Sequence, residues 1–104
     1  MNPIDYCFRI ESGRDEDSER VVMARIALNT LVDPHAYPID LSEMAALSSE
    51  PNILSRSMLS YCAMHPEYFG SLRPELTRRL VAFIQQQATE APSVNAPTPE
   101  DVDP

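Results

Sequence analysis

The fold is decided by residues 18–32, which read SERVVMARIALNTLV. After residue 20, only Arg25, Asn29 and Thr30 interrupt an otherwise apolar run. A helix that is apolar on nearly every side has to be covered on most sides, so we expect this segment to be a central helix. Acidic residues precede it, which suits the positive end of a helix dipole. Asp33-Pro34 ends it, because the residue before a proline avoids the helical region.

Three further helices are expected on the C-terminal side of this central helix. A short one covers residues 41–48, with Asp40 in the N-cap position. Pro51 and Pro74 stand where a proline opens a helix. Each of these two helices carries an apolar stripe at helical spacing: Leu54, Met58, Tyr61 and Cys62 in one, and Leu76, Leu80, Phe83 and Ile84 in the other.

Residues 4–11 show a different pattern, with an apolar residue at every second position. The apolar residues are Ile4, Tyr6, Phe8 and Ile10, and they alternate with Asp5, Cys7, Arg9 and Glu11. This alternation, with aromatic and β-branched side chains, is typical of a half-buried β-strand. The predicted fold class is therefore mainly α, with four helices and one N-terminal strand over residues 4–11.

A lone strand at residues 4–11 needs a second strand, because its backbone hydrogen bonds would otherwise remain unsatisfied. The economical solution is antiparallel pairing with a second copy about a twofold axis. The interface of that homodimer would hold Ile4, Tyr6, Phe8 and Ile10. Two alternatives remain: addition of the strand to a partner's sheet edge, and an edge segment that lies over the helices with water on one side.

Charge and composition restrict the class of protein. Sixteen acidic residues oppose eight bases, all of them arginine, which gives a net charge of −8. Residues 88–104 hold four of the acids and no base, so half of the net charge lies on this short stretch. Its prolines and small residues predict a disordered acidic tail over residues 89–104, after one helical domain over residues 1–88. The domain is too poor in basic surface for direct binding of nucleic acid.

The chain shows neither a targeting signature nor a membrane signature. Its first residues lack the basic and apolar regions of a signal peptide, and no apolar stretch approaches the ~20 residues that span a bilayer. The two cysteines are too few for a disulfide framework. We expect a cytoplasmic protein that does not bind membranes.

Candidate catalytic groups are sparse. Cys62 and His65 could share a helix face, but Cys62 falls on the apolar stripe, where a buried thiol is the ordinary outcome. Cys7, His35, Cys62 and His65 match no metal-binding spacing, and the two glycines form no phosphate-binding loop. We therefore predict that the protein is not an enzyme and has no catalytic residue, metal site or cofactor.

Residues 68–73 carry the clearest signal for protein binding. Tyr68, Phe69 and Leu72 are bulky residues on either side of a glycine and next to Arg73. Aromatic residues and arginine are typical of binding hot spots, so we predict that these four residues contact a partner protein. The alternative is that Tyr68 and Phe69 fold back as a lid on the core.

The segment Ile4-Asp5-Tyr6-Cys7-Phe8-Arg9-Ile10, the helices after it and the tail resemble the QslA family of quorum-sensing antiactivators. The likeness covers roughly residues 3–88. It implies a homodimer that binds the ligand-binding domain of a LuxR-type transcription factor, and so blocks that factor's dimerisation and DNA binding. No family motif aligns with individual residues, so the resemblance assigns a role to none of them. The alternative is an acidic secretion or assembly chaperone, which binds an extended segment of its client.

Overall fold

The computed structural model describes the backbone of residues 1–95 and the side chains of residues 1–88. Within that part the chain is all-helical and contains no strand. The helices are α1 (Pro3–Glu11), α2 (Asp17–Leu31), α3 (Leu41–Ala45), α4 (Ser49–Met64) and α5 (Pro74–Asn95), with a single 3₁₀ turn, η1 (Pro66–Tyr68), before α5.

The predicted strand over residues 4–11 is wrong, because these residues form α1. Local capping favours the helix: the Asn2 side chain accepts a hydrogen bond of 2.9 Å from the backbone N–H of Asp5, and Pro3 occupies the first turn. Asp5 also places a negative charge near the positive end of the helix dipole. The homodimer predicted from strand pairing is therefore also wrong, because residues 4–11 form no strand that could pair.

The apolar residues of α1 separate onto two opposite faces. Residues four apart lie about 40° apart around a helix axis, whereas residues two apart lie about 200° apart. Tyr6 and Ile10 therefore share the face that is buried in the core, and Ile4 and Phe8 share the face that is exposed to solvent. The four residues of the predicted dimer interface thus do not form one surface.

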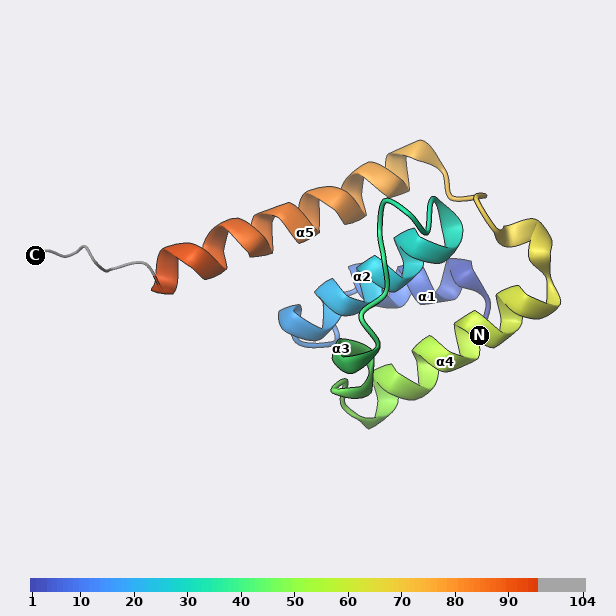
Figure 1. Ribbon diagram of the computed structural model, residues 1–104, viewed down its shortest axis with the longest axis horizontal. Helices are drawn as coiled ribbons and strands as arrows, with labels where there is room; N and C mark the ends of the chain where they lie inside the picture. The colour runs from blue at the N-terminus through green and yellow to red at the C-terminus, as the bar shows by residue number, and fades with distance from the viewer. Residues whose placement is uncertain (96–104) are drawn as a thin grey trace, which may run out of the picture.

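Helix α2 is the centre of the fold, as its sequence predicts. It contacts α1, α3, α4 and α5, and its buried side chains include Met23, Ala24, Ile26, Ala27, Leu28 and Leu31. In Figure 1, α1, α2 and α4 lie close together, while α5 runs above α2 in the view and its C-terminal end extends beyond the other helices. Helices α2 and α5 are in contact. The first half of α5 is held on α2 by buried Leu80 and by the Arg20 guanidinium, 4.3 Å from the centre of the Phe83 ring.

Among the polar contacts that hold α1 against its neighbours, one lies in the core and one at the end of the helix. The hydroxyls of Tyr6 and Ser55 lie 2.7 Å apart in the core, and both residues are fully buried. At the end of α1, Arg9 donates two hydrogen bonds of 2.7 Å to Asp15 and one of 3.2 Å to Glu50. The Arg9 guanidinium lowers the pKa of the Asp15 carboxyl through these hydrogen bonds. This contact joins α1 to the segment before α2 and to the start of α4.

Part of the predicted acidic tail falls on residues that the structure does not describe. Helix α5 continues to Asn95, and residues 96–104 lie outside the described part of the chain. The disorder of the tail therefore stays a prediction. No helix among the described residues is long and apolar enough to cross a membrane.

Candidate protein-binding groove

The outer face of α1 presents two large apolar side chains to solvent. The exposed fractions of Ile4 and Phe8 are 63% and 76%. They stand one helical turn apart, so they form a single apolar ridge. Solvent-exposed apolar residues are ordinary when scattered singly, and a contiguous group is the feature that marks a binding surface.

A groove runs beside this ridge, between α1 and the connection from η1 to α5. It consists of two adjoining hollows that share Ile4, Arg73 and Leu76. The other lining residues are Pro3, Leu31, Glu67, Tyr68, Ser71, Leu72, Glu75 and Arg79. We refer to this feature as the α1–α5 groove.

The walls of the α1–α5 groove are fixed by contacts on both sides. The backbone N–H of Leu72 donates to the carbonyl oxygen of Leu31 at 3.1 Å, which ties the η1–α5 connection to the end of α2. The Tyr68 ring packs edge-on against Tyr61 of α4, with ring centres 5.7 Å apart. In the sequence, Gly70 stands between Tyr68 and Leu72. Its φ of 70° is a left-handed conformation that residues with a side chain rarely adopt. The groove is therefore part of the folded body.

Arg73 differs from Arg79, the other arginine that lines the α1–α5 groove. Within the described part of the chain, five arginines have an acidic partner within ion-pair distance: Arg9, Arg14, Arg20, Arg25 and Arg79. Arg73 is not among them, although it is exposed and lines both hollows of the groove. At one end of the groove, Arg79 donates to Glu11 at 2.7 Å, and Glu11 raises the pKa of the Arg79 guanidinium. Arg73 is therefore the arginine of the groove that has no ion pair among the described residues, and the carboxylates of Glu67 and Glu75 line the groove as well.

The structure brings together three of the four predicted partner-binding residues. Tyr68, Leu72 and Arg73 all line the α1–α5 groove. Phe69 points elsewhere: it is 53% exposed and lines a separate hollow with Val32 and Leu59. The contact of Tyr68 with Tyr61 agrees with the lid interpretation for that residue, so Tyr68 both covers the body and forms a wall of the groove.

Sequence reasoning missed the contribution of α1 to this surface. Ile4 and Pro3 line the groove only because residues 3–11 are helical. The signal that could have found them was Asn2-Pro3 at the start, an N-cap residue followed by a proline at the first helical position. Leu76 was predicted to lie on the apolar stripe of its helix, and the structure places it, half-buried, in the groove.

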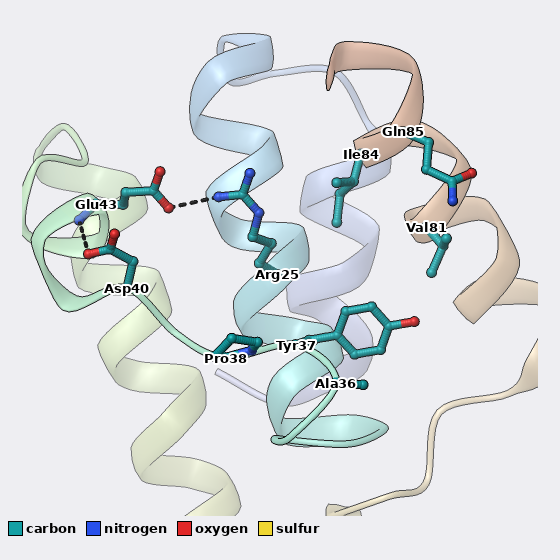
Figure 2. A pocket seen from close by; sticks show the side chains of 9 residues that line it. All are labelled: Arg25, Ala36, Tyr37, Pro38, Asp40, Glu43, Val81, Ile84 and Gln85. Carbon is teal, nitrogen blue, oxygen red and sulfur yellow. Dashed lines mark hydrogen bonds and ion pairs between the residues drawn. The ribbon is translucent and has the colours of Figure 1, made fainter. Parts of the chain in front are cut away.

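A second hollow, between the loop of residues 33–40 and α5, is a weaker candidate. Figure 2 shows Arg25 of α2 reaching Glu43 of α3, and the Tyr37 ring directed towards the side chains of α5. Arg25 and Glu43 form an ion pair of 2.7 Å, and Asp40 accepts hydrogen bonds from the start of α3. Since these charges already satisfy one another, the hollow offers a ligand little beyond apolar contact.

Three of the candidate catalytic and metal-binding groups, Cys7, Cys62 and His65, are packed against other side chains or buried in the core. The buried Cys62 thiol donates to the Met58 sulfur at 3.6 Å, and burial raises the pKa of Cys62. Burial likewise raises the pKa of Cys7 to about 12, so both thiols are held in the protonated, unreactive form at neutral pH. The His65 ring packs on Tyr61. Among the described residues, no three His, Cys, Asp or Glu side chains converge as metal ligands would.

Comparison with known proteins gives no relative: no family model, no curated protein and no solved structure matches this chain.

Proposed function

We propose that this protein is a non-enzymatic regulator that binds another protein at the α1–α5 groove. The observation that carries the proposal is Arg73, an exposed guanidinium without an acidic partner among the described residues. It lies in a groove that apolar side chains line together with Glu67, Glu75 and Arg79. An arginine among apolar and aromatic residues is the composition of binding hot spots. The exposed ridge of Ile4 and Phe8 extends the apolar surface alongside.

The class of partner that we propose to test first is a LuxR-type transcription factor in the cytoplasm. A small helical protein that covers a receptor's dimerisation surface would block its DNA binding without any chemistry of its own. The test also has to recognise the alternative, a secretion or assembly chaperone. A chaperone would bind an extended segment of its client.

The test compares three forms of the protein in affinity capture from native extract of the source cells. Wild type is immobilised beside Ile4→Asp, which places a charge in the groove, and Ile53→Asp, which changes an exposed isoleucine of α4 that does not line the groove. We expect one transcription factor to be retained by wild type and by Ile53→Asp, and to be lost from Ile4→Asp. Mass spectrometry identifies it, and light scattering shows whether its dimer is dissociated.

Equal retention by all three forms would contradict the groove as the binding surface. Recovery of a secreted protein in place of a transcription factor would contradict the regulator and favour the chaperone.

A further inference from the structure

The α1–α5 groove combines an apolar lining with charges of both signs. Its apolar lining includes Ile4 of α1, Leu31 of α2, Leu72 before α5 and Leu76 within α5. The guanidinium of Arg73 and the carboxylates of Glu67 and Glu75 line the same groove. A ligand of a single sign would meet a like charge there, and like charges across an interface are unfavourable. The groove therefore fits a segment in which apolar side chains are flanked by both acidic and basic residues.

Polar groups of the groove that could hold the backbone of an extended peptide are already engaged. The Ser71 hydroxyl donates a hydrogen bond of 2.6 Å to the carbonyl oxygen of Tyr68. A side-chain hydrogen bond between Tyr61 and Tyr68 raises the pKa of Tyr61, so the Tyr68 hydroxyl also has a partner. Within residues 1–95, moreover, no β-strand is present whose edge could pair with an extended ligand.

The backbone of the ligand decides between a helical and an extended occupant. An extended segment brings one carbonyl and, proline apart, one N–H per residue, and these groups need partners wherever they are taken out of water. A sheet edge supplies such partners in many complexes with extended peptides. An α-helix satisfies its backbone internally and presents only side chains to the groove. The α1–α5 groove therefore favours a helical segment.

The shape of the groove agrees with a helical ligand. Its two hollows have volumes of about 460 and 420 Å³ and share Ile4, Arg73 and Leu76 in their linings. On a helix, side chains three or four residues apart are neighbours, so two successive apolar side chains can enter two adjoining hollows. The exposed ridge of Ile4 and Phe8 lies beside the groove, and such a ridge packs between the side-chain rows of a facing helix.

We propose that the occupant of the α1–α5 groove is one amphipathic helix of a partner protein. Its apolar side chains recur at helical spacing and fill the two hollows. An acidic residue of this helix faces Arg73, and a basic residue faces Glu67 or Glu75. The inference rests on the proposed function for the position of the binding site, and it does not depend on the partner being a transcription factor.

A competition between two displayed peptide libraries tests the proposal. Both contain peptides of about 16 residues with the same apolar, acidic and basic side chains. The first has apolar residues at helical spacing, and the second has them at every second position with a proline at the centre, which prevents a helix. Immobilised full-length protein selects binders, and clones that also bind the Ile4→Asp variant are discarded. We expect the remaining clones to come from the helical library.

The selection has two outcomes that would overturn the proposal. The first is a set of remaining clones that comes mainly from the proline-containing library, because the groove would then bind extended segments. The second is that no clone distinguishes wild type from Ile4→Asp, because the groove would then bind neither kind of segment.

A charge reversal tests the expected contact with Arg73. A selected helical peptide is synthesised with a fluorophore, and its dissociation constant is measured by fluorescence anisotropy. Arg73→Glu should weaken binding about tenfold, and replacing one acidic residue of the peptide by lysine should restore binding to this variant. Arg56→Glu is the matched control: it makes the same change in net charge at an exposed arginine of α4 outside the groove, and it should leave the constant almost unchanged. Equal binding to wild type and Arg73→Glu, or no restoration by any single acid-to-lysine peptide, would contradict the proposal.

The outcomes separate this inference from the proposed function. Selection of helical peptides, together with a cell extract from which no transcription factor is retained, would support the inference and contradict the regulator. Selection of extended peptides, together with retention of a transcription factor that is lost from Ile4→Asp, would contradict the inference and support the regulator.

Discussion

The two faces of α1 carry nearly the same chemistry in different surroundings. Tyr6 and Ile10 on the inner face are fully buried, whereas Ile4 and Phe8 on the outer face are more than half exposed. Each face thus has one aromatic and one β-branched residue, one helical turn apart. The comparison shows that a pair of apolar residues on a helix indicates a contact surface, but does not tell whether the contact is within the chain or with another molecule. The inner pair packs against the core of its own chain, and the outer pair is available to another chain.

The largest effect that tests this division is expected from the inner face. Ile10→Ala removes a buried side chain and leaves a cavity, so it should lower the free energy of unfolding by about 2–5 kcal/mol, as measured by urea titration. Ile4→Ala is the matched control on the outer face and should change it by less than about 0.5 kcal/mol. Similar decreases in the free energy of unfolding for Ile10→Ala and Ile4→Ala would contradict the division of α1 into a buried face and an exposed face.

The buried hydroxyls of Tyr6 and Ser55 provide a second test of the comparison between the two faces of α1. Tyr6 on the inner face has a polar partner, whereas Phe8 on the outer face has no polar group. Tyr6→Phe or Ser55→Ala leaves one buried hydroxyl without its partner, and each should cost about 1–3 kcal/mol in urea titrations. The double variant removes both hydroxyls and should cost clearly less than the sum of the two single variants. Strict additivity would show that the two hydroxyls do not interact in solution.

Lowering the pH should weaken the contact between Arg9 of α1 and Asp15, and so lower the free energy of unfolding. Arg9 lowers the pKa of Asp15 in the folded state below the ordinary value of about 4. The stabilisation is therefore complete above the unfolded-state pKa and is lost as the pH falls through the lower folded-state pKa. Wild type should be more stable than Asp15→Asn at neutral pH, and urea titrations should show this advantage shrinking below about pH 4. An advantage that is constant down to the lowest pH would contradict the role of this carboxylate.

The smallest change in stability is expected at the most exposed position of the outer face. Phe8→Ser should alter the free energy of unfolding by no more than about 0.5 kcal/mol, since the side chain is 76% exposed. The same variant should weaken retention of the partner in affinity capture if the ridge belongs to the binding surface. A loss of stability comparable to that of Ile10→Ala would mean that Phe8 packs on its own chain.

These two faces also explain what the sequence could and could not predict. The run over residues 18–32 contains enough helical turns for its pattern to be unambiguous, and it corresponds to α2. Residues 4–11 span barely two turns, and over so short a stretch alternate apolar positions fit either a strand or a helix with two apolar faces. The N-cap of Asn2 and the burial of Tyr6 and Ile10 in the core decide for the helix.

The candidate site was predictable only in part, for a related reason. Tyr68, Leu72 and Arg73 stand out by composition, and each lines the groove. The opposite wall comes from α1, far away in the sequence, and no local pattern reports that Ile4 would lie across from Leu76. That Arg73 lacks an acidic partner among the described residues is likewise a property of the folded chain, because Glu75 lies only two positions away in the sequence.

The central place of α2 has a consequence for the order in which the molecule can open. Since α1, α3, α4 and α5 all contact α2, none of its buried backbone amides can meet solvent unless several of these helices separate together. The amides of residues 23–31 should therefore exchange their hydrogens most slowly, at a rate set by global unfolding. Helix α1, attached by one face only, is a candidate for earlier, local opening that would leave α2 covered by the remaining helices.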